Sequence, residues 1–226
     1  FGIFAQLYNL DGTTKGNEFQ VNTYTTNSQS NPAVASFSDG FVVVWVSNGQ
    51  DGSNYGIFAQ LYNLDGTTKG NEFQVNTYTL DSQGNPKIAS TSDGFVIVWD
   101  SNGQDGDGYG VFGQLYNSDG TKNGNEFQVN TYTTNYQMNP KIASTSDGFV
   151  VVWQSLNQDG AMYGVFAQMY NSDGTTNGNE FQVNTYTTNS QRIPAVASVT
   201  SGGFVIVWYS DGQDGDDSGI FAQRFK

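Results

Sequence analysis

The chain of 226 residues contains no cysteine and no histidine, and 8 basic residues stand against 21 acidic ones. Without cysteine and histidine there is no disulfide framework, no Ser-His-Asp or Cys-His nucleophile and no zinc site of the usual ligands. The net charge of −13 repels nucleic-acid phosphates and anionic lipids. The sequence therefore argues against nucleic-acid partners and against docking to a membrane surface.

Long apolar runs are also missing. The longest extends from Phe41 to Val46, which is far below the roughly 20 residues that a membrane helix needs, so we expect no membrane insertion. No stretch has a helical period. Aromatic residues are plentiful, with 16 Phe, 13 Tyr and 4 Trp, and they provide the bulky side chains of a β-sheet core.

The rarest residue types are evenly spaced. Proline occurs only at Pro32, Pro86, Pro140 and Pro194, tryptophan only at Trp45, Trp99, Trp153 and Trp208, and glutamate only at Glu18, Glu72, Glu126 and Glu180. The interval is 54 residues throughout, apart from 55 between the last two tryptophans. The chain is therefore one tandem-repeat domain, 1–226. We divide it into units 1–54, 55–108, 109–162 and 163–217, with 218–226 left over.

Each unit contains four short segments rich in β-branched and aromatic residues. The first set covers 32–37, 41–45, 56–62 and 72–76, with turns of Ser-Asp-Gly, Gly-Gln-Asp-Gly and Asp-Gly-Thr-Thr between them. Four strands in a unit of about 50 residues are typical of a β-propeller blade. We predict an all-β fold, a four-bladed β-propeller built from four four-stranded repeats. A linear stack and a sandwich of the same strands are the alternatives.

The repeated motifs resemble a known class of protein. Pro-x-Val-Ala, Asp-Gly-Phe-Val-Val-Val-Trp, Gly-Gln-Asp-Gly, Gly-Ile-Phe-Ala-Gln and Glu-Phe-Gln-Val-Asn are similar to the tandem propeller-type repeats of large secreted or surface calcium-binding adhesin-like proteins. The resemblance covers essentially the whole chain. It implies an extracellular or cell-surface location and neighbours in series.

One strand is present in surplus. The segment equivalent to 56–62 opens the chain at 2–8 and closes it at 218–226, so it occurs five times while the other strands occur four times. An unpaired strand can pair with another chain. We therefore predict head-to-tail strand donation between copies of the chain, and the residues of this assembly strand are Ile220, Phe221, Phe225, Ile3 and Phe4. The alternative explanation for the surplus strand is that the sequence is a longer tandem array cut at an arbitrary repeat boundary.

The loops after the second strand combine carboxylates with glycine, a pattern that suits Ca²⁺. The acid-rich loops 101–107 and 210–217 contribute Asp105, Asp107, Asp214 and Asp216, whereas Asp51 and Asp159 are single carboxylates that would bind more weakly. The resemblance also implies calcium, which is the expected cofactor. Asp-Gly is equally a common turn sequence.

Catalysis is not expected from this pattern. Paired carboxylates act in an asymmetric cluster, whereas nearly every acid here recurs once per unit, and the exceptions Asp81 and Asp100 occupy different parts of the unit. We predict a non-enzymatic extracellular building block that assembles into a fibre or repeat array. The alternative is a carbohydrate-binding, lectin-like propeller with glycan partners. In that case the recurring glutamines and tryptophans would line sugar sites. Their alternative role is structural: the glutamines would hydrogen-bond backbone groups of the connections, and the tryptophans would pack between blades. The glutamines are Gln29, Gln83, Gln137 and Gln191.

Overall fold

The computed structural model describes residues 1–199 and 202–226, and in this part of the chain every regular element is a β-strand. The strands form five antiparallel sheets, which we number I to V in chain order. The prediction of an all-β protein with sheets of four antiparallel strands is confirmed. No helix that could cross a bilayer is found among the described residues.

The three middle sheets have four strands each. Sheet II contains β3 (Gln29–Phe37), β4 (Gly40–Asn48), β5 (Tyr55–Asn63) and β6 (Thr68–Gln74); sheet III contains β7 (Gln83–Ser90), β8 (Gly94–Asn102), β9 (Tyr109–Asn117) and β10 (Lys122–Gln128); sheet IV contains β11 (Gln137–Ser144), β12 (Gly148–Leu156), β13 (Tyr163–Asn171) and β14 (Phe181–Gln182). In each, neighbouring strands follow one another in sequence, as in a β-meander.

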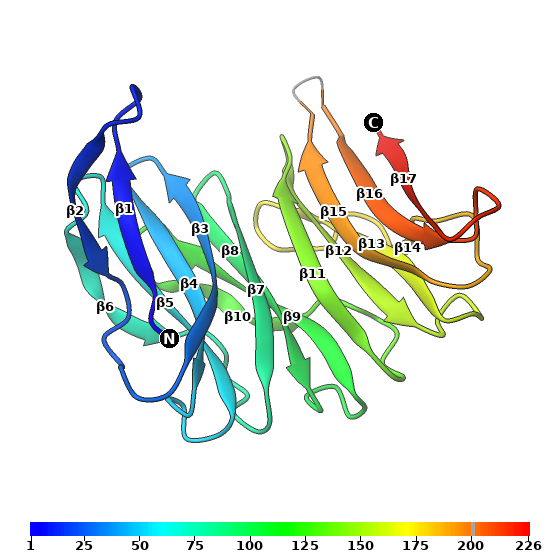
Figure 1. The fold of residues 1–226 in the computed structure, drawn as a ribbon, viewed down its shortest axis with the longest axis horizontal. Coiled ribbons are helices and arrows are strands. Elements are labelled where there is room, and N and C mark those ends of the chain that lie inside the picture. Colours follow the sequence, from blue (N-terminus) through cyan, green and yellow to red (C-terminus); the bar gives the residue numbers. More distant parts are fainter. Residues whose placement is uncertain (200–201) are drawn as a thin grey trace.

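The two ends of the chain form smaller sheets. Sheet I pairs β1 (Phe4–Tyr8) with β2 (Thr14–Gln20), and sheet V contains β15 (Gln191–Ser198), β16 (Phe204–Asp211) and β17 (Ser218–Phe225). Figure 1 shows the sheets following one another along an arc, with the two termini on opposite sides of the molecule. The structure does not confirm four equal blades, because three complete sheets lie between two incomplete ones. The division into repeat units stays a prediction.

The first strand of each larger sheet lies on the inner side of the arc. β3 contacts β7, β7 contacts β11, and β11 contacts β15. All four inner strands contain a β-bulge at their beginning, where the register with the second strand shifts. The bulge holds a residue in the left-handed backbone region, namely Asn31, Asn85, Asn139 and Ile193, with φ of 52°, 50°, 57° and 52°. Asparagine tolerates this conformation, whereas β-branched isoleucine does not.

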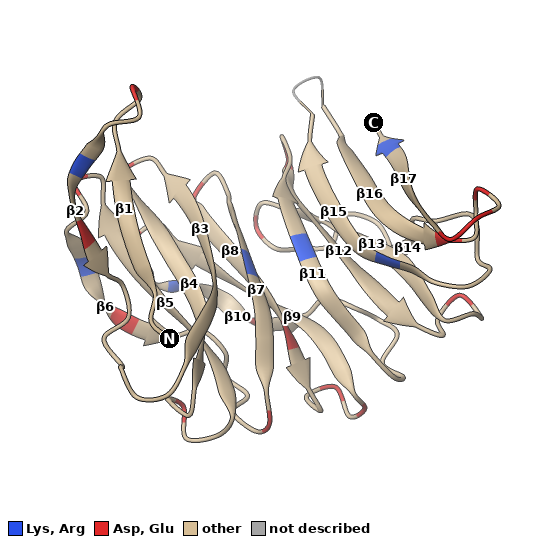
Figure 2. Cartoon of the chain, viewed as in Figure 1, with Lys and Arg blue, Asp and Glu red and all other residues tan. Residues whose placement is uncertain are grey.

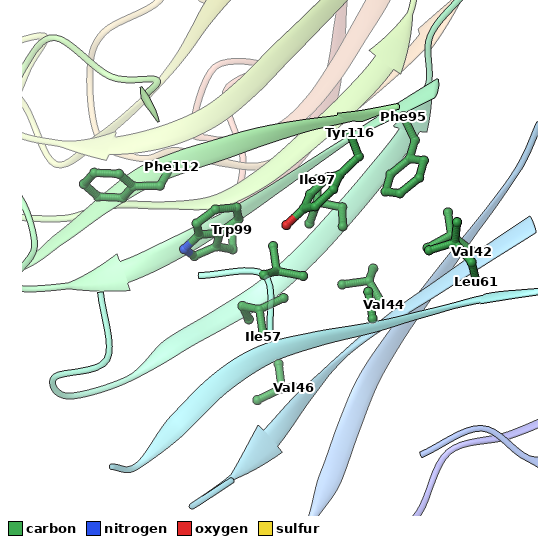
Figure 3. Close-up of a cluster of buried hydrophobic side chains, with 12 residues drawn as sticks. Val42, Val44, Val46, Ile57, Leu61, Phe95, Ile97, Trp99, Phe112 and Tyr116 are labelled. Atoms are coloured by element: carbon green, nitrogen blue, oxygen red, sulfur yellow. The ribbon is translucent and has the colours of Figure 1, made fainter. Parts of the chain in front are cut away.

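The hydrophobic core consists of layers between neighbouring sheets. Between sheets II and III, Val44 and Leu61 pack with Ile97, Trp99 and Tyr116 (Figure 3). The Trp99 side chain is fully buried, as are those of the equivalent tryptophans of β4 and β12. These indoles therefore fill the space between sheets and are not available as sugar platforms.

Glutamates join neighbouring sheets on the outer side. Glu126 of β10 accepts hydrogen bonds from the Thr77 backbone N–H at 2.7 Å and from Gln104 Nε2 at 2.6 Å. The same joint recurs at Glu72 and Glu180. Among the described residues, Glu18 of sheet I makes no such bond, whereas the other three glutamates each bond to the connection that follows the preceding sheet. The regular glutamate spacing therefore serves the stacking of sheets.

Candidate functional site

The surplus strand is used within its own chain. β17 pairs with β16 over its whole length, from Ser218 opposite Asp211 to Phe225 opposite Phe204. Phe221 and Phe225 pack against the core of sheets IV and V, and the Phe225 ring stacks on Phe204 with centroids 4.9 Å apart. This strand completes the hydrogen bonding of β16 and is not free for donation.

The N-terminal copy of the same strand is also built into the fold. Ile3 is buried beside Trp45, and its backbone N–H donates to Asn22 Oδ1 at 2.7 Å. Among the predicted assembly residues, Phe4 and Ile220 have exposed side chains, at 57% and 64%. The five predicted residues are therefore split between core and surface.

The acidic loops use their carboxylates within the protein. Asp107 Oδ2 accepts the Asn135 N–H at 2.9 Å, and Asp105 Oδ2 lies 3.4 Å from Asn130 Nδ2. Burial raises the pKa of Asp105, since it penalises the charged form. In the described part of the chain no three acidic side chains gather where they could hold a metal ion.

The remaining loop acids shape turns. Asp51 Oδ1 accepts the N–H of Ser53 at 3.1 Å, and Asp159 Oδ1 that of Ala161 at 3.2 Å. Asp214 Oδ1 lies 3.5 Å from the N–H of Asp216, two residues further on. These are short-range turn contacts of the kind that Asp-Gly sequences commonly form. Calcium binding at these loops stays a prediction.

The recurring glutamines form hydrogen bonds that hold the connections between sheets in place. Gln83 is fully buried; its Nε2 donates to the Leu80 carbonyl at 2.8 Å, and its Oε1 accepts from Asn76 Nδ2 at 3.2 Å. Gln137 makes the same pair of bonds, to the Thr134 carbonyl and from Asn130. Their amides are satisfied inside the protein, which gives these glutamines a structural role. Gln83 is also among the residues that line the pocket described next.

A pocket of about 440 Å³ opens where the inner strands begin, between sheets II, III and IV. Its polar wall includes Asn31, Asn85 and Asp100, and its aromatic wall includes Tyr55 and Tyr109. Of the residues that line it, Asp100 is the one ionisable acid. A concave site with aromatic walls and few polar groups is the usual form of a small-molecule site.

Asp100 is the most unusual side chain of this pocket. It is only 2% exposed, and its Oδ2 accepts hydrogen bonds from Asn85 Nδ2 at 2.8 Å and from the Asn139 N–H at 3.2 Å. Burial raises the pKa of Asp100 above its ordinary value, although these hydrogen bonds and nearby lysines oppose the shift. The carboxyl therefore holds its proton to a higher pH than an exposed aspartate.

The position of Asp100 breaks the repeat. The equivalent residues of the other units are Val46, Gln154 and Tyr209. Gln154 Oε1 accepts the Ile193 N–H at 3.0 Å, which is the same link to the next sheet that Asp100 makes to Asn139. A neutral glutamine therefore satisfies the structural need, and the acid is an additional feature of this one pocket.

Two lysines lie on the inner strands beside this acid. Lys87 of β7 and Lys141 of β11 are half-buried, and Figure 2 shows both strands marked by a basic residue near the centre of the molecule. Lys87 Nζ donates to the Pro86 carbonyl at 2.9 Å, and Lys141 Nζ lies 3.4 Å from the Pro140 carbonyl. Burial lowers the pKa of both lysines, and the positive charge of Lys87 lowers that of Lys141 further.

Tyrosine rings border the pocket. Tyr55 is 39% exposed, and the Tyr109 ring lies 6.1 Å from that of Tyr136, centroid to centroid, at a tilt of 50°. Tyr136 also departs from the repeat, which has serine at this place in the other units. Burial raises the pKa of Tyr109, and Asp100 raises it further by charge repulsion. The site thus combines flat aromatic faces with amide and carboxyl groups.

The signal for this site was present in the sequence as a departure from the repeat. Asp100 breaks the repeat in the sequence, but the other exception, Asp81, occupies a different part of the unit, so the pair by itself does not predict a catalytic cluster. The lysines break it as well, because the other two inner strands have alanine at this place, Ala33 and Ala195. Comparing the units position by position would have singled out Asp100, Lys87, Lys141 and Tyr136 together.

Comparison with known proteins identifies the fold. No known protein family matches the sequence, and no curated protein sequence is similar to it. Among solved structures, an endo-arabinase from Bacteroides thetaiotaomicron VPI-5482 is similar with a TM-score of 0.52 and 12% identity, over 95% of this chain and 82% of that one. A thermostable family-43 glycoside hydrolase gives 0.51 and 11%, over 86% and 71%. An α-L-arabinofuranosidase from Lactobacillus brevis gives 0.51 and 9%, over 88% and 72%.

These structures are five-bladed β-propellers, so the chain has a β-propeller fold and its propeller-type repeats are confirmed. The resemblance to calcium-binding adhesin-like proteins finds no support among them. The prediction of a non-enzymatic, filament-forming building block is wrong: the similar structures are glycoside hydrolases, and the strand meant for donation is paired within the chain. The error arose because the surplus strand was expected to be unpaired, and because the acids that depart from the repeat, Asp81 and Asp100, were expected not to form a catalytic cluster.

Proposed function

We propose that the chain is a carbohydrate-processing β-propeller and that the pocket around Asp100 receives a saccharide and cleaves a glycosidic bond. The observation that supports this most directly is the buried carboxyl of Asp100, which stands at a break in the repeat and lines the pocket. The similar solved structures are enzymes that act on glycosidic bonds, which makes this reaction the natural one to test.

The chemistry follows from the protonation of Asp100. A carboxyl that keeps its proton through burial can act as a general acid. In the proposed step the Asp100 proton passes to the leaving glycosidic oxygen as the bond to the anomeric carbon breaks. Water then bonds to that carbon and releases a proton to solvent, from which Asp100 is reprotonated. The tyrosine faces hold the sugar ring, and Asn31 and Asn85 offer amides to its hydroxyls.

The expected rate is modest. Glycosidases ordinarily use two carboxyl groups, one on each side of the scissile bond. Asp100 is the one acid among the residues that line this pocket, and general acid catalysis alone contributes about 10²–10⁴-fold. The assay therefore needs long incubation and sensitive detection of released reducing ends.

The experiment measures cleavage of arabino-, xylo- and uronate-containing oligosaccharides by the parent and by Asp100→Asn. We expect slow cleavage by the parent, declining as the pH rises through the pKa of Asp100, and loss of cleavage in the variant. Asp93→Asn removes an exposed acid from the turn between β7 and β8 and is the matched control. Equal rates in the parent and in Asp100→Asn would contradict the role of Asp100. Cleavage of none of the oligosaccharides would contradict the proposed reaction.

A further inference from the structure

The two lysines on the inner strands are unusual because they place positive charge inside a protein that is acidic as a whole. The chain has only 8 basic residues and a net charge of −13. Two of these residues, Lys87 and Lys141, lie on adjacent inner strands that contact one another. Both are half-buried. Two adjacent inner strands near the centre of an otherwise acidic protein therefore each have a basic residue (Figure 2).

Neither ammonium group is neutralised by an ion pair. The salt bridges among the described residues are Lys69–Asp39 and Arg192–Asp211. Lys87 and Lys141 donate to backbone carbonyls instead. Asp100, the nearby acid, directs Oδ2 to Asn85 and Asn139 and forms no salt bridge with either lysine. The nearby Asp100 carboxylate favours the charged form of both lysines. One carboxyl group without a salt bridge balances at most one of these two partly desolvated positive charges, which leaves room for an anion.

The fold does not require these lysines. The inner strands β3 and β15 have Ala33 and Ala195 at the same place, after the same bulge and the same proline. Alanine therefore satisfies the backbone geometry in two of the four inner strands. Among the four inner strands, lysine occupies this place only in the two next to Asp100: β7, in the sheet that contains this acid, and β11, in the sheet that follows it.

We propose that Lys87 and Lys141, which lie near Asp100 without lining the pocket themselves, bind the anionic group of an acidic saccharide that extends from the pocket, so that the site selects sugars with a carboxylate or a sulfate ester over neutral ones. This inference rests on the proposed function, because it takes the pocket to be a saccharide site. Ammonium groups bind both anions by charge-assisted hydrogen bonds. Since the protein as a whole repels anions, affinity for an acidic sugar has to come from this local positive charge.

The test is calorimetric titration of the intact chain with three saccharides of equal length: an oligogalacturonide, a sulfated galactan oligosaccharide and a neutral xylo-oligosaccharide. We expect one of the two acidic sugars to bind at least tenfold more tightly than the neutral one at low salt. The difference should shrink as salt is added, because salt screens the charges. The uronate and sulfate arms decide which anion the site takes.

The variants use residues that the repeat already contains. The double variant Lys87→Ala and Lys141→Ala should fold as the parent does, which a thermal unfolding curve checks, and should lose the preference for acidic sugars. Lys122→Thr removes one exposed positive charge from β10, where the other units have threonine, and should keep the preference.

The outcomes separate this inference from the proposed function. If the neutral sugar binds as tightly as the acidic ones, or if the double variant keeps the preference, the lysine proposal is overturned while a saccharide site at the pocket stands. If acidic sugars bind through the lysines but are not cleaved, the inference stands and the proposed cleavage fails. If none of the three sugars binds, the saccharide site is refuted and the inference falls with it.

Discussion

Ile193 is held in a backbone conformation that its side chain disfavours, and relieving this strain should stabilise the protein. Its φ is 52°, whereas the same bulge holds asparagine in the other three inner strands, for example Asn31 with φ 52°. The left-handed region costs a residue with a β-carbon about 1–2 kcal/mol, and asparagine compensates by local hydrogen bonding. Ile193 is 54% exposed, so its replacement gives up little buried apolar area. We expect Ile193→Asn to stabilise the fold by about 1 kcal/mol.

This free energy corresponds to a small but measurable increase in Tm, because the unfolding entropy grows with the length of the chain. With about 2.1 cal/mol/K per residue of unfolding entropy over 226 residues, 1 kcal/mol corresponds to a Tm increase of about 2 °C. The Ile193 N–H that donates to Gln154 Oε1 at 3.0 Å is kept in the variant. Differential scanning calorimetry and urea unfolding measure the effect.

Two control variants make this reasoning refutable. Ile193→Val keeps the branched β-carbon and should leave Tm unchanged. Asn31→Ile introduces the strain at an equivalent exposed position and should lower stability by a similar amount. If Ile193→Asn leaves Tm unchanged or lowers it, or if Asn31→Ile has no effect, backbone strain at the bulge does not control stability here.

Three further predictions concern the acids. Burial raises the pKa of Asp100 above its ordinary 3.8, so the cost of its ionised form is absent below pH 3.8 and grows as the pH rises through the raised pKa. Asp100→Asn should therefore be more stable than the parent at pH 7 and nearly as stable as the parent at pH 3, and the same difference in urea unfolding at both pH values would contradict this. Glu126→Ala removes the bonds to Thr77 and Gln104 and should cost about 1 kcal/mol, while Glu18→Ala, which breaks no joint, should be neutral; equal effects would refute the role of the joints. Calcium at the loops of Asp105, Asp107, Asp214 and Asp216 predicts a higher Tm with millimolar Ca²⁺ than with Mg²⁺, and an identical Tm would count against it.

Much of the local structure could be predicted from the sequence, because it depends on short-range patterns. The even spacing of proline, tryptophan and glutamate defined the repeat, and the β-branched runs bounded by Asp-Gly turns placed strands close to where β4 and β5 lie. The bulge at the start of each inner strand was not predicted. It depends on the pairing of the inner strand with its neighbour, which extends the strand back to Gln29.

The arrangement of the sheets and the composition of the site were decided only by the tertiary structure. The repeat period specifies one sheet per unit, but the angle between neighbouring sheets depends on how the side chains between them pack, for example Leu61 with Trp99. A strand count alone could not show that β17 pairs with β16 of its own chain. Likewise, Asp100 and Lys141 are separated in the chain, and they come near one another because β11 packs against β8 of the preceding sheet. Their chemistry comes from burial, which is a property of the folded molecule.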